Sequence, residues 1–171
     1  MKRSKELNSS QLQLQNALLN LLSESSFEEI TITKLCQEAA VSRMAYYRNY
    51  DSIQALYQEI IEDFLNEFLN QSSGLIQNQN WKIFWQEFYS YLYLHKDTVK
   101  RLLQSHQHNI LLPLLNKLFV PINIQNQLYE SYQIQGIIGL TYNMIVMWVD
   151  QSFRLEPNKL AELCESLIPI K

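Results

Sequence analysis

Four residues in a short segment of this 171-residue chain have the types and spacing to contact double-stranded DNA. They are Arg43, Met44, Ala45 and Tyr47. The apolar residues around them are spaced to face inward: Leu35, Ala39, Val41 and Tyr46. Because the major groove is only about 12 Å wide, it admits a short helix that is exposed on one side and supported by a second helix. We therefore predict that the four outward-facing side chains contact the groove and the DNA backbone.

Other residues that often carry chemistry give weaker signals. Imidazole is a common zinc ligand, but His106 and His108 diverge on a helix, and no carboxylate or cysteine joins them or His95 at ligand spacing. Cys36 and Cys164 are far apart, which indicates neither a disulfide framework nor a zinc knuckle and fits a reducing cytoplasm. The chain has no nucleophile elbow, no phosphate-binding glycine loop and no recognisable catalytic acid pair. We predict no metal site, no cofactor and no enzymatic activity.

Composition favours an all-helical fold. The chain is 47% apolar and has three glycines and four prolines, too few turn residues for a β-rich fold of this length. The N-terminus lacks the apolar region of a signal peptide. The most apolar stretch, residues 134–149, is shorter than the roughly 20 residues needed to cross a bilayer. We predict a cytoplasmic protein that does not enter a membrane.

Charge alone does not indicate nucleic-acid binding. The net charge is −3, and residues 1–57 carry six basic and six acidic side chains, whereas DNA-binding modules usually show a basic excess. Most of these basic residues lie in the N-terminal arm or in the short segment around Arg43. The prediction of DNA binding therefore depends on position.

Apolar periodicity and capping residues predict about nine helices. Ser9 or Ser10 would cap the first, Thr33 a second over residues 34–39, and Ser42 a third that ends at Arg48. The fourth starts at residue 51 or 52 and ends near residue 69. Further helices are expected over residues 81–94, 97–106, 111–119, 125–152 and 157–168. Residues 1–52 would form a helix-turn-helix domain with a basic arm, and residues 53–171 a helical effector-binding and dimerisation domain.

Residues 27–50 resemble the DNA-binding domain of the TetR/AcrR family of transcriptional regulators, and the resemblance covers about residues 9–60. The family has threonine at the start of the second helix, a small pair and Val-Ser in the turn, and Tyr-x-x-Phe at the end of the third helix. Those places are occupied here by Thr33, Ala39-Ala40, Val41-Ser42 and Tyr47-x-x-Tyr50.

The resemblance implies roles for individual residues. Thr33 and Tyr47 would hydrogen-bond phosphates, while Arg43, Met44 and Ala45 would face base edges. An arginine can form a bidentate pair with guanine, so Arg43 is the expected specificity residue. The basic arm would follow phosphates or the minor groove. The predicted DNA-binding set is completed by Lys2, Arg3, Lys5, Lys34, Ser42, Arg48 and Asn49.

Two positions depart from the family pattern. Ala40 stands where the turn usually has glycine, so a left-handed backbone there would be strained. Ile53 stands near the start of the fourth helix, where the family often has a lysine beside the DNA backbone. One phosphate contact would then be missing, which predicts weaker binding. Tyr46 and Tyr50 are expected in the core.

Residues 133–148 are too apolar for a solvent-facing helix and need partners on two sides. One side would pack on its own subunit and the other on a second copy, as in the four-helix interface of TetR-like proteins. A two-fold dimer would place its recognition helices about 34–36 Å apart and select a palindromic site. The predicted interface comprises Gly136, Gly139, Leu140, Asn143, Met147, Leu160 and Leu163.

Aromatic residues of the C-terminal part could line an effector pocket, although ordinary core packing is the alternative interpretation. They are Trp81, Trp85, Phe88, Tyr89, Tyr132 and Tyr142. The sequence thus predicts a homodimeric DNA-binding regulator, a repressor released by a small apolar or aromatic effector. The alternative is a regulator-like protein-interaction module with weak or no DNA binding, which the neutral N-terminal half and Ile53 would suit.

Overall fold

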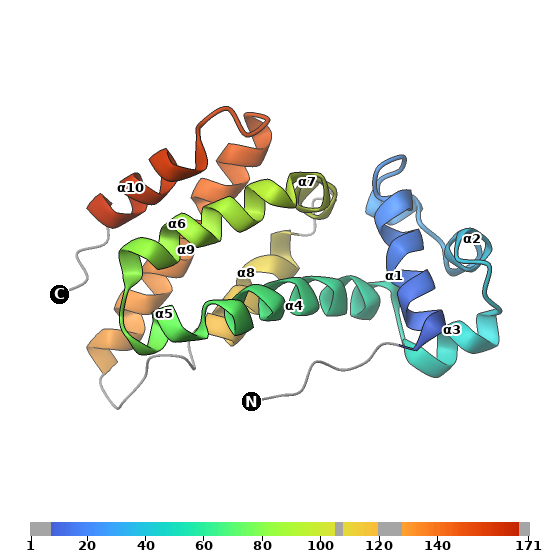
Figure 1. The fold of residues 1–171 in the computed structure, drawn as a ribbon. Coiled ribbons are helices and arrows are strands. Elements are labelled where there is room, and N and C mark those ends of the chain that lie inside the picture. The colour runs from blue at the N-terminus through green and yellow to red at the C-terminus, as the bar shows by residue number, and fades with distance from the viewer. Residues whose placement is uncertain (1–7, 105–107, 120–127, 168–171) are drawn as a thin grey trace.

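The computed structural model describes residues 8–104, 108–119 and 128–167, and the described residues form helices and no strands (Figure 1). This confirms the predicted all-α class. Three helices, α1 (Ser9–Leu21), α2 (Ile32–Glu38) and α3 (Arg43–Asn49), form a head at one end of the molecule. A 3-10 turn, η1 (Phe27–Glu29), connects α1 to α2.

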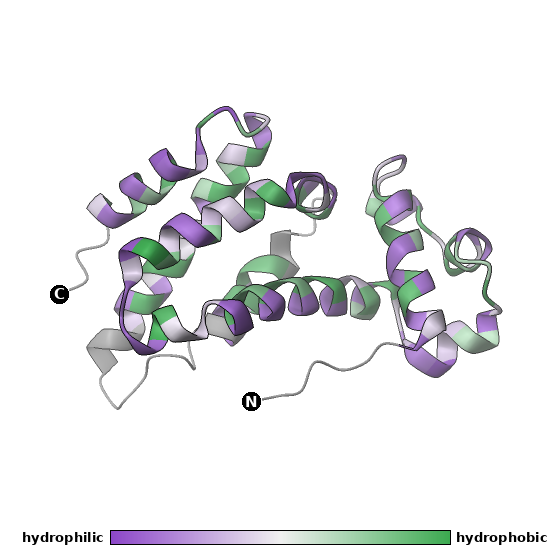
Figure 2. Ribbon diagram, viewed as in Figure 1, coloured by the Kyte–Doolittle hydropathy of each residue, from purple (hydrophilic) through white to green (hydrophobic). Residues whose placement is uncertain are grey.

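The long helix α4 (Ile53–Gln71) leads from the head into the rest of the molecule, which we call the body (α4–α10; Figure 1). Its further helices are α5 (Ser73–Gln77), α6 (Trp81–Leu94), α7 (Lys96–Gln104), α8 (His108–Phe119), α9 (Leu128–Asp150) and α10 (Pro157–Leu167). Figure 2 shows apolar residues along one side of α4 and polar residues along the other. Its apolar side packs on both cores of the molecule.

Two hydrophobic clusters hold these helices together. The first runs from the head along α4 to α7 and α8 and is mainly aliphatic around fully buried Leu14, Leu18 and Leu35. The second joins α6, α9 and α10 and is rich in aromatic rings, with Tyr89 and Trp148 in its centre. Because the first cluster crosses residue 53, the head shares its core with α4. The predicted domain boundary between residues 52 and 53 does not separate two hydrophobic cores, and the separate functions assigned to the two domains stay a prediction.

The structure confirms two of the four predicted N-capping residues. Ser42 caps α3 and Ser52 caps α4, each with its hydroxyl accepting a backbone N–H three residues on, as predicted. The other two caps were predicted wrongly. Asn8 rather than a serine caps α1, and Thr31 rather than Thr33 caps α2. In both cases a capping residue precedes the predicted one, and the helix begins at the first position that can use it.

The sequence predicted no helix between the end of the fourth helix near residue 69 and the next one at residue 81, so the short helix α5 was missed. Ser73 and Gly74 lie inside it, directly after the end of α4. Glycine and serine are common in turns, but here backbone hydrogen bonds such as Leu75 N–H to the Ser72 carbonyl, at 3.0 Å, continue the helical path. The helix α6 has the predicted bounds. The described residues therefore contain ten α-helices, one more than expected.

Candidate nucleic-acid interface

The turn between α2 and α3 sets the direction of the third helix. Ala40 lies in the left-handed region with a φ of 52°, the conformation that favours the glycine usual in the family at this position. The Val41 N–H donates to the Cys36 carbonyl at 3.0 Å and the Ala40 N–H to the Gln37 carbonyl at 3.1 Å. These two bonds form a Schellman motif, which satisfies the last carbonyls of α2. The turn is therefore well hydrogen-bonded, and alanine adds strain to it.

The exposed face of α3 carries most of the residues that were predicted to face DNA. Met44 is 81% exposed and Tyr47 is 58% exposed, and Arg43 and Arg48 are exposed as well. Leu35, Ala39 and Tyr46 are buried, and Val41 is partly buried, as predicted. The prediction that Ala45 points away from the core is wrong, because Ala45 is only 8% exposed. Its position on α3 places it on the inward side beside Tyr46.

Arg43 and Thr33 are bonded to each other across the two helices. The Arg43 guanidinium donates from Nη2 to the Thr33 hydroxyl, and both residues are exposed. Lys34, the neighbour of Thr33, donates from Nζ to the Ser25 hydroxyl at 2.7 Å. Thr33 therefore lies beside the start of α3, whereas the Lys34 side chain is directed to the loop that follows α1.

Ser42 and Asn49 have structural partners within the head. The Ser42 hydroxyl accepts the Ala45 N–H at 3.1 Å. The Asn49 amide donates to the Ala45 carbonyl at 2.7 Å and accepts from the Asn8 amide at 3.1 Å. The start of α1 is thereby attached to the end of α3. Lys2, Arg3 and Lys5, predicted to contact DNA, lie outside the described residues.

Tyr46 and Tyr50 lie in the core, as predicted, with exposed fractions of 0% and 3%. Burial raises the pKa of Tyr46 to about 12. Tyr50 donates from its hydroxyl to the Glu59 carboxylate at 2.8 Å, which connects the end of α3 to α4. Burial and this carboxylate together raise the pKa of Tyr50 above its usual value. Both phenols are therefore uncharged over the physiological range, and the Tyr50 hydroxyl serves as a hydrogen-bond donor to α4.

Ile53 is partly buried and packs against the first cluster. An apolar side chain in this position cannot pair with a phosphate. The described part of the head, residues 8–52, carries Lys34, Arg43 and Arg48 as its basic residues and five acidic ones. A strong general attraction to DNA is therefore not built into this part of the chain.

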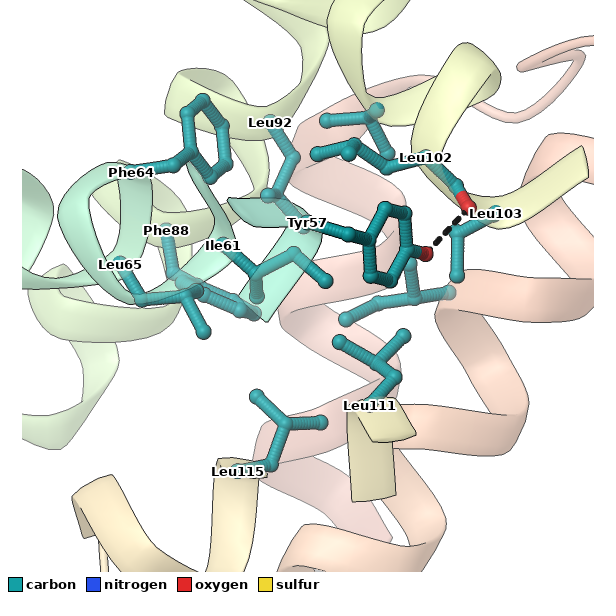
Figure 3. Close-up of a pocket in the computed structure, with 12 residues that line it drawn as sticks. Tyr57, Ile61, Phe64, Leu65, Phe88, Leu92, Leu102, Leu103, Leu111 and Leu115 are labelled. Carbon is teal, nitrogen blue, oxygen red and sulfur yellow. Dashed lines mark hydrogen bonds between the residues drawn. The ribbon is translucent and has the colours of Figure 1, made fainter. Parts of the chain in front are cut away.

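A cavity of about 50 Å³ lies between α4, α6, α7, α8 and α9 (Figure 3). Its lining is apolar, with Ile61 and Leu65 from α4 and Leu111 and Leu115 from α8 among the residues that face it. Tyr57, also on α4, donates its hydroxyl hydrogen to the Leu102 carbonyl of α7 at 2.7 Å. A charged or strongly polar group would find no partner in this lining.

The predicted aromatic pocket residues do not together line this cavity. Phe88 lines it, whereas Trp81, Trp85 and Tyr89 do not and belong to the second cluster or pack against it. Tyr132 is 72% exposed, and Tyr142 packs against the first cluster. The aliphatic lining from α7 and α8 was missed. Runs of leucine at helical spacing do not by themselves distinguish a cavity wall from a filled core.

The predicted dimer residues fall into two groups. Gly136, Asn143 and Met147 are exposed on α9, and Met147 is 61% exposed. Gly139 and Leu140 are partly buried, and a Cβ on either glycine would have open space around it. On α10, Leu163 is 44% exposed. Leu160 is 5% exposed and belongs to the second cluster, so its prediction as an outward-facing contact is wrong.

The remaining candidate residues are the histidines and the two cysteines. His95 packs edge-on against Phe64, and the His106 and His108 side chains lie outside the described part of the chain. Within that part, no group of His, Cys, Asp and Glu side chains could hold a metal ion. Cys36 and Cys164 are buried free thiols, and burial raises the pKa of each. No helix of the described residues is long and apolar enough to span a membrane.

No family model matches the sequence, and no curated protein matches it closely enough to count as a relative. Solved structures do match. A TetR transcriptional regulator from Streptococcus agalactiae superposes with a TM-score of 0.65 at 18% identity over 93% of each chain. The fatty acid degradation regulator FadR from Bacillus halodurans gives a TM-score of 0.65 at 13% identity over 96% of each chain.

NalD from Pseudomonas aeruginosa, described as the secondary repressor of the MexAB-OprM multidrug efflux pump, gives a TM-score of 0.60 at 14% identity over 93% of each chain. The likeness in each case extends over nearly the full length of the chain. At such low identity it establishes the architecture, and function has to be argued from the residues. The chain has a TetR-type fold.

Proposed function

We propose that this protein is a DNA-binding transcriptional regulator, a repressor that binds a palindromic operator as a homodimer. The observation that carries the proposal is the exposed face of α3, where Arg43, Met44 and Tyr47 project from a short helix supported by α2. A helix of this kind can enter the major groove and present an arginine to base edges. The structural neighbours are described as regulators of transcription, and NalD as a repressor.

The homodimer is supported by the apolar residues that α9 and α10 leave exposed. Tyr132, Gly136, Asn143 and Met147 recur at spacings of four, seven and four residues, which places them along one side of α9. Leu163 and Leu167 are four residues apart on α10 and are both about half exposed. Exposed large apolar side chains such as Tyr132 and Met147 on α9 and Leu163 and Leu167 on α10 commonly mark a protein interface where they form a contiguous patch. The two glycines would let a second helix approach closely.

Effector control is supported by the position of the cavity. Four of its lining residues belong to α4, the helix that continues from the head. A small apolar molecule that occupied the cavity would press on α4, and it would change DNA affinity if it bound better to one arrangement of the two heads. Because the lining is apolar, the binding free energy of such an effector would come from buried apolar surface rather than from hydrogen bonds.

DNA binding is tested by electrophoretic mobility shift with the duplex upstream of the protein's own gene. Wild-type protein should form a specific complex. Arg43→Ala and Tyr47→Ala should each weaken the complex, and the double variant should retain only salt-sensitive, non-specific binding. The control Lys82→Ala lies on the exposed surface of α6 in the body and should bind like the wild type. Specific binding that survives both substitutions would refute the assignment of α3.

Dimerisation is tested by sedimentation velocity. Met147→Glu and Leu163→Glu each place a charge on the exposed apolar residues and should shift the protein to a monomer that no longer retards the palindromic duplex. Glu165→Gln, on the exposed surface of α10, is the matched control and should remain dimeric. A wild-type protein that sediments as a stable monomer would contradict the proposed dimer.

The effector is tested by mass spectrometry of an organic-solvent extract of the purified protein. Ile61→Phe should fill the cavity and remove any apolar molecule that copurifies with the wild type. Ile83→Phe, on the exposed side of α6, is the control for the added ring. An extract that is identical for wild type and Ile61→Phe would remove the cavity from the proposal.

A protein-interaction module is the second candidate, and Ile53 favours it. Its side chain packs against the core where a lysine would face the DNA backbone, and the described head has no basic excess. This candidate predicts that no duplex is bound even at low salt, where phosphate contacts are strongest. The mobility-shift experiment therefore also decides between the two functions.

A further inference from the structure

The hydrogen bond between Arg43 and Thr33 joins the first turns of α2 and α3. Thr33 is the second residue of α2, and Arg43 is the first residue of α3. Their side chains meet with Arg43 Nη2 donating to Thr33 Oγ1. Among the described residues, the Arg43 guanidinium has one hydrogen-bond partner, the Thr33 hydroxyl. An uncharged group therefore holds the cation in place.

Arg43 stands at a position where helix energetics disfavour a cation. The N-terminus of a helix carries partial positive charge, so a basic residue in the first turn is repelled. The first turn of α3 also contains no acidic residue that could compensate. Local stability thus gives no reason for an arginine here. A residue that breaks a local rule at an exposed position is more simply explained by what it contacts outside the chain.

The chemistry of the pair leaves the guanidinium available for DNA. Arginine has five N–H donors in a fixed planar arrangement, and a single bond to Thr33 leaves enough for a bidentate contact with guanine. Threonine is β-branched, so its hydroxyl has few χ1 rotamers on the rigid backbone of α2. A carboxylate in its place would instead neutralise the cation and compete with DNA for it.

We propose that Thr33 is a positioning residue for sequence recognition, whose hydroxyl holds the Arg43 guanidinium in the orientation that meets a base edge. This inference rests on the proposed function and differs from a role of Thr33 as a phosphate ligand. A free arginine side chain loses much rotamer freedom when it binds. The bond to Thr33 removes part of that freedom before DNA arrives. Because the bond acts on Arg43 alone, its effect on DNA affinity is confined to the base pair that Arg43 contacts.

The test is selection from a pool of randomised duplexes, followed by affinity measurements on the selected site and its single-base variants. Thr33→Val removes the hydroxyl while keeping the shape, Thr33→Ser keeps the hydroxyl, and Arg43→Ala removes the cation. We expect Thr33→Val to weaken binding about three- to tenfold, the range of one hydrogen bond. It should also lose discrimination at the same base pair as Arg43→Ala. Thr33→Ser should retain that discrimination.

A double-mutant cycle separates positioning from phosphate binding. If Thr33 acts through Arg43, then Thr33→Val has no further effect in the Arg43→Ala background. Additive losses, or an equal loss on every duplex sequence, would show a phosphate contact and overturn the proposal. Arg48→Ala, at the other end of α3, is the control for a uniform loss across sequences.

A measurement without DNA keeps this proposal distinct from the proposed function. In the free protein, ¹⁵N relaxation of the Arg43 side chain should show restricted motion that Thr33→Val releases and Thr33→Ser preserves. Equal mobility in wild type and Thr33→Val would refute the positioning role even if the protein binds DNA. If the wild type selects no duplex while the restriction is present, the proposed function fails, and the role in recognition falls with it.

Discussion

In the head, each of the three α-helices starts at a side chain that caps it, whereas the helices of the body are joined mainly by packed aromatic rings. Asn8, Thr31, Ser42 and Ser52 each accept a backbone N–H at the start of a helix, within the head or at the start of α4. In the body, Trp148 contacts Tyr89, Tyr93 and Phe153, with ring centroids 4.9–6.0 Å apart. The head is thus shaped by interactions local in sequence and the body by contacts between distant helices.

This difference suits what we propose for each region. A recognition helix of seven residues is too short to be stable alone, so its cap and the packing of its Tyr46 side chain in the first cluster must fix its orientation. The body has to hold a cavity and an exposed apolar surface. Large rings buried against one another can support both, because each contributes much apolar area. Four substitutions test the comparison, from the largest expected effect to the smallest.

Trp148→Ala should lower the free energy of unfolding by about 3–5 kcal/mol, the usual cost of removing a buried tryptophan. Trp148 is 2% exposed and its indole N–H donates to the Leu155 carbonyl at 2.8 Å. Urea unfolding measures the loss. Trp81→Ala, at a partly exposed position, is the control and should cost less. If Trp148→Ala increases hydrogen exchange in α2 and α3 as much as in α10, the two regions are not separate and the comparison fails.

Tyr57→Phe should cost about 1–3 kcal/mol, because it leaves the buried Leu102 carbonyl without this donor. The bond joins α4, the helix that continues from the head, to α7. Tyr93→Phe removes a hydroxyl from a ring that is 39% exposed. It should change the free energy of unfolding by less than about 0.5 kcal/mol. Equal effects of the two substitutions would show that the α4–α7 bond contributes no more to the free energy of unfolding than an exposed hydroxyl does.

Ser42→Ala should lower stability by about 1 kcal/mol through loss of the α3 cap. Hydrogen exchange should increase in α3 first, since the Ala45 N–H loses its acceptor. The control Ser90→Ala lies on the exposed surface of α6, away from a helix start, and should leave stability nearly unchanged. No difference between the two variants would indicate that packing alone orients α3.

Ala40→Gly should raise stability by about 0.5–1 kcal/mol. Glycine relieves the strain of the left-handed backbone at φ 52°, and the greater freedom of its unfolded chain offsets part of the gain. Ala55→Gly, in the first turn of α4, is the matched control with the opposite expected sign. Thermal unfolding measures both. A loss of stability in Ala40→Gly would mean that the turn is not strained by alanine.

The sequence by itself determined the parts that depend on near neighbours. The caps at Ser42 and Ser52 and the bounds of α6 follow from residues within about four positions, where propensity and hydrogen bonding act directly. The two wrong caps were displaced by one or two residues. The alternation of inward and outward side chains on α3 was correct except at Ala45, because a small residue at the edge of a face can be covered by its neighbours.

Tertiary structure decided the rest. Leu160 was expected to face a second copy and instead packs in the second cluster. The cavity is lined mainly by aliphatic residues of α4, α7 and α8, and Phe88 is the member of the predicted aromatic set that lines it. The bond between Arg43 and Thr33 joins residues ten positions apart on two helices, and only the angle between those helices brings the atoms together. Apolar periodicity predicts which side of a helix is buried. It does not predict which other helix packs against that side, because the free energy of apolar burial does not depend on direction or on the identity of the partner.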